Sequence, residues 1–345
     1  MAYTTINNGR EYFEPQGWTG SGSARSISNL DFQPDWTWIK HRNGTSNHNL
    51  FDVIRGATIY IESSSTAPNQ TGTDRLTAFN SNGFSLGTNG GVNADGDTYM
   101  SWNWKAGGTG VSNTDGDVTS TVSANTTAGF SIVKWNSTGT AGIDIGHGLG
   151  KKPKMIISKC ININGTSWPV YHVAEGATVY LSWNLNIAGT TSATRWNNSE
   201  PTTTTFQTGS SGDIGGSDRT MLAYCFTDIP GYSKFGKYAG NGSSDGTFVY
   251  TGFKPAFLMT KVITTTGDWQ MCDWKRASAV NPINKDLRPN NSDSETTNTF
   301  VDFYSNGFKL RNNFGNWNGS GQEYAYMCFA QSPVVGSNNI PATAR

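Results

Sequence analysis

Charged side chains are scarce in this sequence, and neither sign predominates. They make up 14% of the 345 residues, with 25 basic and 25 acidic side chains. A neutral chain lacks the basic surface that attracts nucleic acid or an anionic membrane. No apolar run is long enough to cross a bilayer, and the start "MAYTTINNGREYF" lacks the cationic and apolar segments of a secretory signal. We therefore expect no nucleic-acid partner, no membrane insertion and no secretory route.

Cysteine is rare too, and its spacing argues against a zinc ribbon. The four positions are Cys160, Cys225, Cys272 and Cys328. None forms a C-x-x-C pair. Each lies in an apolar run, where a small buried thiol is the expected role and a disulfide is the alternative.

Histidine is equally rare and gives no sign of a catalytic base. The four positions are His41, His48, His147 and His172. His172 aligns with Asp52 and Asp273 in the repeated stretches described below. A catalytic base is not expected to be exchanged in this way, so we expect structural or solvent-exposed roles for the histidines.

Enzyme motifs are missing as well. The sequence has no nucleophile elbow, no phosphate-binding glycine loop and no H-E-x-x-H. No predicted strand carries the paired acids that sandwich glycosidases use. The triplet Asp-Gly-Asp occurs at 95–97 and 115–117, but a full calcium loop needs more oxygen ligands at set spacing. We expect no enzymatic activity, no cofactor and no bound metal.

Glycine and aromatic residues, in contrast, are abundant. The chain has 41 glycines with many Ser, Thr and Asn residues, and 12% of its residues are aromatic. Disordered chains contain few aromatics, so this composition predicts many short strands joined by polar turns. The turns are explicit, because "SNGF" occurs at 81–84 and 305–308, and Asn-Gly supplies the positive φ of tight hairpins.

One seven-residue pattern occurs three times. A proline, five mostly apolar residues and a lysine stand at 34–40, 153–159 and 255–261. Such segments are too short for helices, and we interpret each as a core strand. The proline is expected to mark the start of the strand, and the lysine its exit to solvent.

Further motifs follow each of these strands in the same order, which indicates a triplicated unit. From Pro34 to the closing aromatic Trp104 is 70 residues; the corresponding distances are 73 to Phe226 and 74 to Phe329. The copies span about 12–106, 129–228 and 234–331. In the closing strand 98–104, alternate residues face opposite ways, which is typical of a half-buried strand.

The sequence thus predicts an all-β protein of three tandem antiparallel β-sandwich repeats of jelly-roll or concanavalin-like type. The predicted parts are repeat 1 (1–106), a linker with a possible strand (107–128), repeat 2 (129–230), repeat 3 (231–332) and a surface tail (333–345). Inward-facing aromatics are expected to pack between the two sheets of each sandwich.

Ten of the twelve tryptophans fall into two groups. Six fall on repeated strand positions and are expected in the core: Trp36, Trp38, Trp102, Trp104, Trp168 and Trp269. Four lie in polar turns or where the copies diverge: Trp183, Trp196, Trp274 and Trp317. These four are the candidate binding residues, because an exposed indole can stack on a sugar ring. Packing within loops is the alternative.

Three stretches resemble a known family. They are "FSIVKW" with "GHGLGKKPKMII" (130–157), "GYSKFGKYAGNGSSDGTFVYTGFKPAF" (231–257) and "DFYSNGFKLR" (302–311). They are similar to a repeated domain of uncharacterised function that is common in tailed, mostly marine, phages, whose members also end in a short "A-R" motif like "PATAR" here. The resemblance implies a concanavalin-like sandwich in a tail-fibre or other virion structural protein, and it brings no catalytic residues.

The resemblance and the composition together favour a virion structural protein, made in the host cytoplasm. The leading hypothesis is a tail-fibre or tail-associated adhesin that contacts a host surface glycan or protein. A capsid decoration or head-fibre protein is the second hypothesis, and a surface-glycan depolymerase is the third. Other virion proteins are the expected partners. A homo-oligomer is expected, with a trimer favoured, because closed symmetry is usual for such parts.

Overall fold

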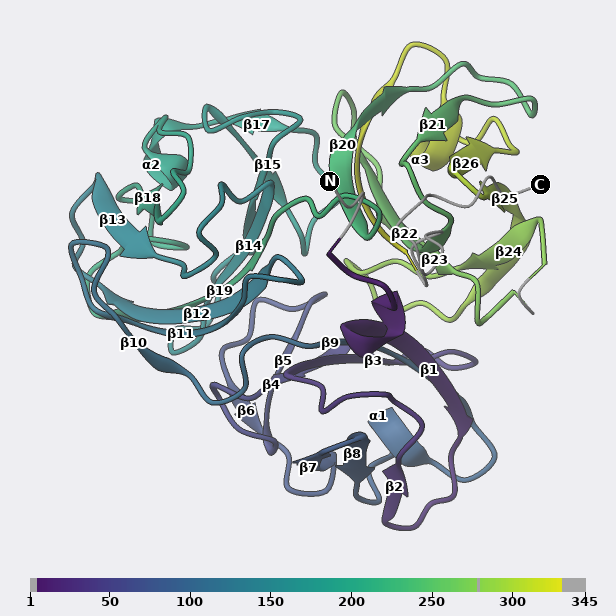
Figure 1. Cartoon of the computed structure of the whole chain (residues 1–345), viewed down its shortest axis with the longest axis horizontal. Coiled ribbons are helices and arrows are strands. Elements are labelled where there is room, and N and C mark those ends of the chain that lie inside the picture. Colours follow the sequence, from purple (N-terminus) through teal and green to yellow (C-terminus); the bar gives the residue numbers. More distant parts are fainter. Residues whose placement is uncertain (1–4, 278–279, 331–345) are drawn as a thin grey trace.

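The protein is an all-β molecule. The computed structural model describes residues 5–277 and 280–330. In this part of the chain 27 strands pair in antiparallel sheets, and the helices have only three or four residues each. The strands form three lobes around a common centre (Figure 1). We call residues 5–106 the first lobe, 107–228 the second lobe and 229–330 the third lobe.

The first lobe contains two sheets. Its elements are η1 (Gly9–Glu11), β1 (Phe13–Thr19), β2 (Arg25–Ile27), β3 (Trp36–His41), β4 (Asn49–Asp52), β5 (Ile59–Glu62), β6 (Gln70–Thr71), β7 (Leu76–Asn80), β8 (Gly83–Leu86), α1 (Gly90–Asn93) and β9 (Thr98–Trp104). The larger sheet has the order β1-β9-β3-β4-β5-β6 and the smaller β2-β8-β7. A hydrophobic cluster with Ile39, Phe84 and Tyr99 joins the two sheets, as in a β-sandwich.

The second lobe has a similar plan. Its elements are β10 (Val111–Asn113), β11 (Ser120–Asn125), β12 (Phe130–Ser137), β13 (Ile143–Gly146), β14 (Met155–Cys160), β15 (Pro169–His172), β16 (Val179–Ser182), β17 (Thr190–Thr191), α2 (Ala193–Trp196), β18 (Thr205–Thr208) and β19 (Arg219–Phe226). The larger sheet has the order β10-β11-β12-β19-β14-β15-β16-β17, and β13 pairs with β18. Trp135, Ile156 and Phe206 pack in the cluster that joins them.

The third lobe has two four-stranded sheets. Its elements are β20 (Ser233–Ala239), β21 (Phe248–Tyr250), β22 (Pro255–Val262), β23 (Trp269–Asp273), β24 (Ile283–Asp286), β25 (Thr296–Tyr304), β26 (Gly307–Leu310), α3 (Gly315–Asn318) and β27 (Glu323–Ala330). The sheet orders are β20-β27-β22-β23 and β21-β26-β25-β24. One sheet of each lobe therefore contains four strands in the same order. These strands are β1-β9-β3-β4, β12-β19-β14-β15 and β20-β27-β22-β23.

The segment expected to link the first two copies belongs to the sheet of the second lobe. The strand expected within 117–125 is β11, which pairs with β12, and β10 pairs with β11 at the sheet edge. The predicted tail 333–345 lies outside the described residues.

The repeated Asn-Gly turns need glycine chiefly because of a close backbone approach. A Cβ on Gly83 would lie 1.8 Å from the carbonyl oxygen of Ile27, and one on Gly307 would lie 2.1 Å from that of Val249. Each glycine starts the second strand of a hairpin, where the neighbouring strand passes close by. The glycine in "SNGF" therefore allows β8 and β26 to join their sheets.

The largest hydrophobic cluster, which we call the central core, lies between the lobes rather than inside any one of them. All six tryptophans expected in the core are buried in it, together with residues of all three lobes. Trp36 of the first lobe stacks on Tyr224 of the second at a centroid distance of 4.3 Å. Phe13 stacks on Phe329 of the third lobe at 5.1 Å. The expectation that these aromatics pack between the two sheets of one sandwich was wrong for this group.

The central core also explains why β9 is buried on both faces, although its alternation predicted a half-buried strand. Met100, Trp102 and Trp104 face the central core. Tyr99, on the other face, packs in the first lobe's own cluster. A sheet that is covered on both faces has no side exposed to solvent. The alternate residues of β9 therefore face two different hydrophobic clusters, not a cluster and water.

The three lysines that close the repeated pattern do not exit to solvent. Lys40, Lys159 and Lys261 are fully buried, so this prediction was wrong. Each ammonium donates to backbone carbonyls, for example Lys159 Nζ to Thr66 O at 3.0 Å and to Thr166 O at 2.6 Å. Burial lowers the pKa of each of the three to about 8. The buried lysines thus satisfy carbonyls in loops that would otherwise lack partners.

Backbone hydrogen bonds close the three lobes into a ring. The bonds run from Asn69 N to Ile161 O (2.9 Å), from Gly189 N to Ile263 O (2.9 Å) and from Glu295 N to Arg42 O (2.7 Å). In each case the acceptor stands two residues after one of the buried lysines. The first lobe therefore bonds to the second, the second to the third and the third back to the first.

The cysteines behave as expected, since all four are buried and unpaired. Within the described residues, no helix has the length and apolarity that a membrane crossing requires.

Candidate ligand-binding site

Three of the four candidate tryptophans lie inside the protein. Trp183 packs in the central core, Trp196 in the cluster of the second lobe, and Trp317 in that of the third. Trp274 is half-buried, with the ammonium of Lys275 5.3 Å from its ring centroid. The four indoles therefore form no common surface, and three of them present no open face to solvent. Of these four tryptophans, only Trp317 lines the cavity of the third lobe.

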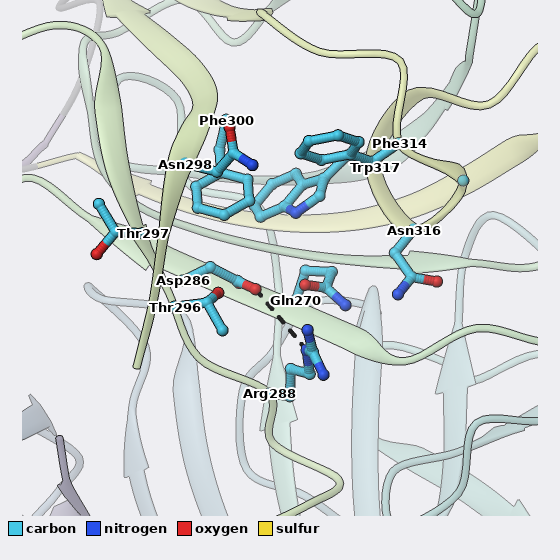
Figure 2. Close-up of a pocket in the computed structure, with 11 residues that line it drawn as sticks. Gln270, Asp286, Arg288, Thr296, Thr297, Asn298, Phe300, Phe314, Asn316 and Trp317 are labelled. Atoms are coloured by element: carbon cyan, nitrogen blue, oxygen red, sulfur yellow. Dashed lines mark ion pairs between the residues drawn. The ribbon is translucent and has the colours of Figure 1, made fainter. Parts of the chain in front are cut away.

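That cavity is in the third lobe and has a volume of about 380 Å³. Its walls come from β23, the β24–β25 hairpin and α3, as Figure 2 shows. The lining residues are Gln270, Asp286, Arg288, Thr296, Thr297, Asn298, Phe300, Phe314, Gly315, Asn316 and Trp317. Polar groups and aromatic rings therefore share one concave surface of a size typical of small-molecule sites.

Asn318 fixes the helical turn that carries Trp317. Its side-chain amide donates to Asn241 Oδ1, Ser243 O and Asn312 O, each at 2.8 Å. The hydroxyl of Tyr324 donates to Gly315 O at 2.6 Å at the other end of the turn. A four-residue helix has little stability of its own, so these bonds hold the aromatic wall in place.

Asp286 lies at the floor of the cavity and is 2% exposed. Burial raises the pKa of its carboxyl to about 8, against the opposing charges of Arg276 and Arg288. The Gln270 amide, oriented with its nitrogen toward Asp286, donates to the two carboxyl oxygens at 3.2 and 2.6 Å. The floor is therefore a hydrogen-bonding carboxyl that carries little negative charge near neutral pH.

Arg288 borders the cavity among three carboxylates. Its guanidinium lies 3.3 Å from Asp293, 3.8 Å from Asp268 and 4.0 Å from Asp286. Its Nε atom is buried and has no hydrogen-bond partner in the protein, as is true of Trp317 Nε1. Acidic neighbours already balance the arginine, so the cavity is not a site for an anion. Both atoms belong to residues that line the cavity.

In the first and second lobes, an arginine side chain occupies the place that corresponds to this cavity. Asp286 pairs with Thr296 in its ladder, as Tyr60 pairs with Gln70 and Tyr180 with Thr190. Arg75 lies 4.3 Å over the Tyr60 ring, and Arg195 lies 4.3 Å over the Tyr180 ring. In the third lobe an aspartate replaces the tyrosine, and no arginine stacks there. This exchange leaves the space open.

The lining contains few ionisable side chains. Asp286 is the only carboxylate among the residues that line the cavity, whereas glycoside hydrolysis ordinarily uses two. Among the described residues, no group of three or more His, Cys, Asp or Glu side chains is placed to hold a metal. The Asp-Gly-Asp turns serve local bonding, for example Asp97 Oδ1 to Asn43 Nδ2 and Asp117 Oδ2 to Asp144 N.

No histidine is among the residues that line the cavity. Desolvation lowers the pKa of His147 and His172 to about 4 and that of His48 well below its usual value. His172 Nε2 bonds to Tyr326 O of the third lobe at 3.1 Å. His41 pairs with Asp97 at 3.3 Å. These contacts are structural.

Sequence reasoning missed Asp286, Arg288 and Gln270. The sequence did hold a signal for Asp286. The first two copies carry a tyrosine in "ATIYI" and "ATVYL", and the third copy, which has diverged here, carries an acid at the corresponding position. The third copy had lost too much of the motif for the two segments to be aligned by eye. The strand pairing makes the correspondence visible.

The chain matches the model of one protein family. The model of the family described as "Domain of unknown function (DUF7483)" matches residues 8–333, and this single match includes all three lobes. No curated protein matches the chain. Since the match covers most of the sequence, the chain belongs to the DUF7483 family.

Proposed function

We propose that the protein is a phage virion structural protein, placed in the tail fibre or elsewhere on the tail, where it contacts the host surface. The observation that carries this proposal is the closed ring of three lobes around one aromatic core. Such a ring is a rigid block that displays loops of three lobes without moving parts. An adhesive particle component needs this property, because preorganisation lowers the entropic cost of each contact.

We further propose that the lobes are tandem repeats of one concanavalin-like antiparallel sandwich. The shared strand order supports this, and so does the recurrence of the inter-lobe bond two residues after each buried lysine. Asp52, His172 and Asp273 add a third argument. Each stands at the end of a corresponding strand and reaches toward the next lobe. Independent sandwiches would not share these contacts.

The proposal extends to partners and location. The protein is made in the host cytoplasm, assembles with other virion proteins and acts without catalysis on the particle. A homo-oligomer, with a trimer favoured, stays part of the proposal, although the ring already places three similar lobes within one chain.

Adsorption competition tests the host contact. Host cells are incubated with the purified protein, phage are added, and the phage that remain free are counted. Free phage should rise with protein dose if the protein occupies the receptor. An unchanged count, with a folded protein confirmed by circular dichroism, contradicts an adhesin.

One observation favours the capsid decoration or head-fibre alternative. Phe248, Tyr250 and Tyr304 are 45%, 58% and 39% exposed in the third lobe, and the rings of Phe248 and Tyr304 are in contact. An exposed aromatic patch of this kind suits a contact with another protein. Antibody labelling of particles in the electron microscope separates the two positions, since the label then marks either the tail or the head.

A further inference from the structure

We propose that the cavity of the third lobe binds one neutral sugar ring of a host surface glycan. This inference rests on the host contact proposed above and names the chemistry of the receptor. It differs from the stacking on exposed tryptophans that the sequence suggested, because the ligand enters a walled cavity with a polar floor (Figure 2).

The first argument is the unmet hydrogen bonding. Trp317 Nε1 and Arg288 Nε are buried donors without partners in the protein. Figure 2 shows the indole nitrogen of Trp317 on the side of the ring that faces Gln270 and Arg288. A buried donor left unpaired destabilises the protein. A ligand that brings oxygen acceptors to both atoms removes this cost.

The second argument is the combination of walls. Phe300 stacks on Trp317 at a centroid distance of 5.4 Å, and Phe314, 40% exposed, stands at the rim. Opposite them lie Asp286, Gln270 and Asn316, as Figure 2 shows. A pyranose has an apolar C–H face and a rim of hydroxyls that both donate and accept. It therefore matches an aromatic wall that faces carboxyl and amide groups.

The third argument excludes other ligand classes. An anionic sugar or phosphate gains little from Arg288, whose charge is balanced by Asp268 and Asp293. A metal ion finds a single carboxylate among the lining residues. A wholly apolar ligand would match the aromatic wall but not the polar side chains of Asp286, Gln270 and Asn316 opposite it. A neutral polyhydroxylated ring satisfies each of these conditions.

The site is expected once per chain. Arg75 and Arg195 stack over Tyr60 and Tyr180 at the matching positions of the first and second lobes. Those arginines fill the space that Asp286 leaves open in the third. A stoichiometry of one, rather than three, therefore follows from the same geometry.

Binding is measured by saturation-transfer-difference NMR and calorimetry on the full chain. The probes are the methyl pyranosides of glucose, galactose, mannose and N-acetylglucosamine, methyl glucuronide as the charged comparison, and the oligosaccharides released from the host envelope. At least one neutral probe should bind saturably with one site per chain, and the glucuronide should bind more weakly than its neutral counterpart.

Two variants locate the site. Trp317→Phe keeps the ring but removes Nε1, and should weaken binding roughly 2- to 10-fold. Phe314→Ala removes the rim ring, and should weaken binding about 10-fold. Ile163→Ala is the matched control, because Ile163 is 39% exposed, close to the 40% of Phe314, and lies outside the cavity. Its affinity should equal that of the wild type.

The outcomes separate this inference from the proposed function. If no neutral probe or envelope oligosaccharide gives a signal that Phe314→Ala weakens, the sugar site is overturned, even where the protein blocks phage adsorption. If a sugar binds in the cavity but the protein does not block adsorption, the site holds and the adhesin function fails.

Discussion

At the scale of single residues, the most informative position is the end of the strand that meets the next lobe. Asp52 accepts a hydrogen bond from the hydroxyl of Tyr224 at 2.9 Å, and Asp273 accepts one from Trp102 Nε1 at 3.1 Å. Where the other lobes carry Tyr224 and Trp102, the third lobe presents Met327 to the second lobe. The methionine side chain has no hydrogen-bond donor. There the chain carries His172, which bonds to a backbone carbonyl instead. The exchange of aspartate for histidine therefore matches the hydrogen-bond partner that the neighbouring lobe offers.

The first prediction concerns Asp286. Its folded pKa is raised to about 8, so the folded protein holds a proton that the unfolded chain loses near pH 4. The stability due to this neutral carboxyl is complete below pH 4 and is lost as pH rises to 8. Asp286→Asn mimics the neutral form. Between pH 5 and pH 8 the variant should gain roughly 1–4 kcal/mol in unfolding free energy relative to the wild type.

Urea unfolding of both proteins at the two pH values measures this difference. Asp293→Asn serves as control, because Asp293 also pairs with Arg288 but its side chain is 57% exposed. A difference between Asp286→Asn and wild type that is the same at pH 5 and pH 8 would show that the carboxyl is ionised throughout.

At the scale of elements, loops between strands make hydrogen bonds that hold neighbouring lobes together. The loop after β5 carries Thr66, whose carbonyl accepts from Lys159 of the second lobe and from the backbone of Gly165. Trp168 Nε1 bonds to Ser65 O in the same loop at 2.9 Å. In the next pair of lobes, Trp269 Nε1 bonds to Ser182 O at 2.8 Å. Each lobe thus receives a loop from its neighbour.

The second prediction tests this docking. Lys159→Met keeps the length of the side chain but removes the ammonium that donates to the carbonyls of Thr66 and Thr166, of which Thr66 O keeps the bond from Gly165 N. The unfolding free energy should fall by about 1–3 kcal/mol. Lys151→Met, at an exposed position, should change it by less than about 0.5 kcal/mol. Equal values for the two variants in urea titrations would mean that the buried ammonium does not stabilise the contact.

At the scale of the whole molecule, the central core makes the three lobes one structure. Trp36 packs against Trp104 of its own lobe at a centroid distance of 4.4 Å and against Tyr224 of the second lobe at 4.3 Å. Phe257 and Phe329 bring the third lobe into the same cluster. A lobe taken alone would expose the inner face of its larger sheet. The single family match across all three lobes agrees with a ring that folds as one unit.

The third prediction follows from this shared core. Thermal unfolding should occur in one transition, with equal calorimetric and van't Hoff enthalpies, although the chain is longer than most two-state proteins. Trp36→Ala should lower the unfolding free energy by about 3–5 kcal/mol. Hydrogen exchange should then accelerate in all three lobes. Amides of the third lobe that keep their full protection in this variant would show that the lobes unfold independently.

The sequence alone determined the local structure and the order of the parts. Period-two alternation, Asn-Gly turns and three similar strand series predicted an all-β chain, because these features depend on neighbouring residues. The tertiary structure decided which environment each face meets. Lys40 and Trp102 lie in strands that were identified correctly, yet the lysine is buried and the tryptophan faces another lobe. The cavity likewise arises from Gln270, Asp286 and Trp317, which come from separate segments of the chain, and such contacts become visible only when the sheets are assembled.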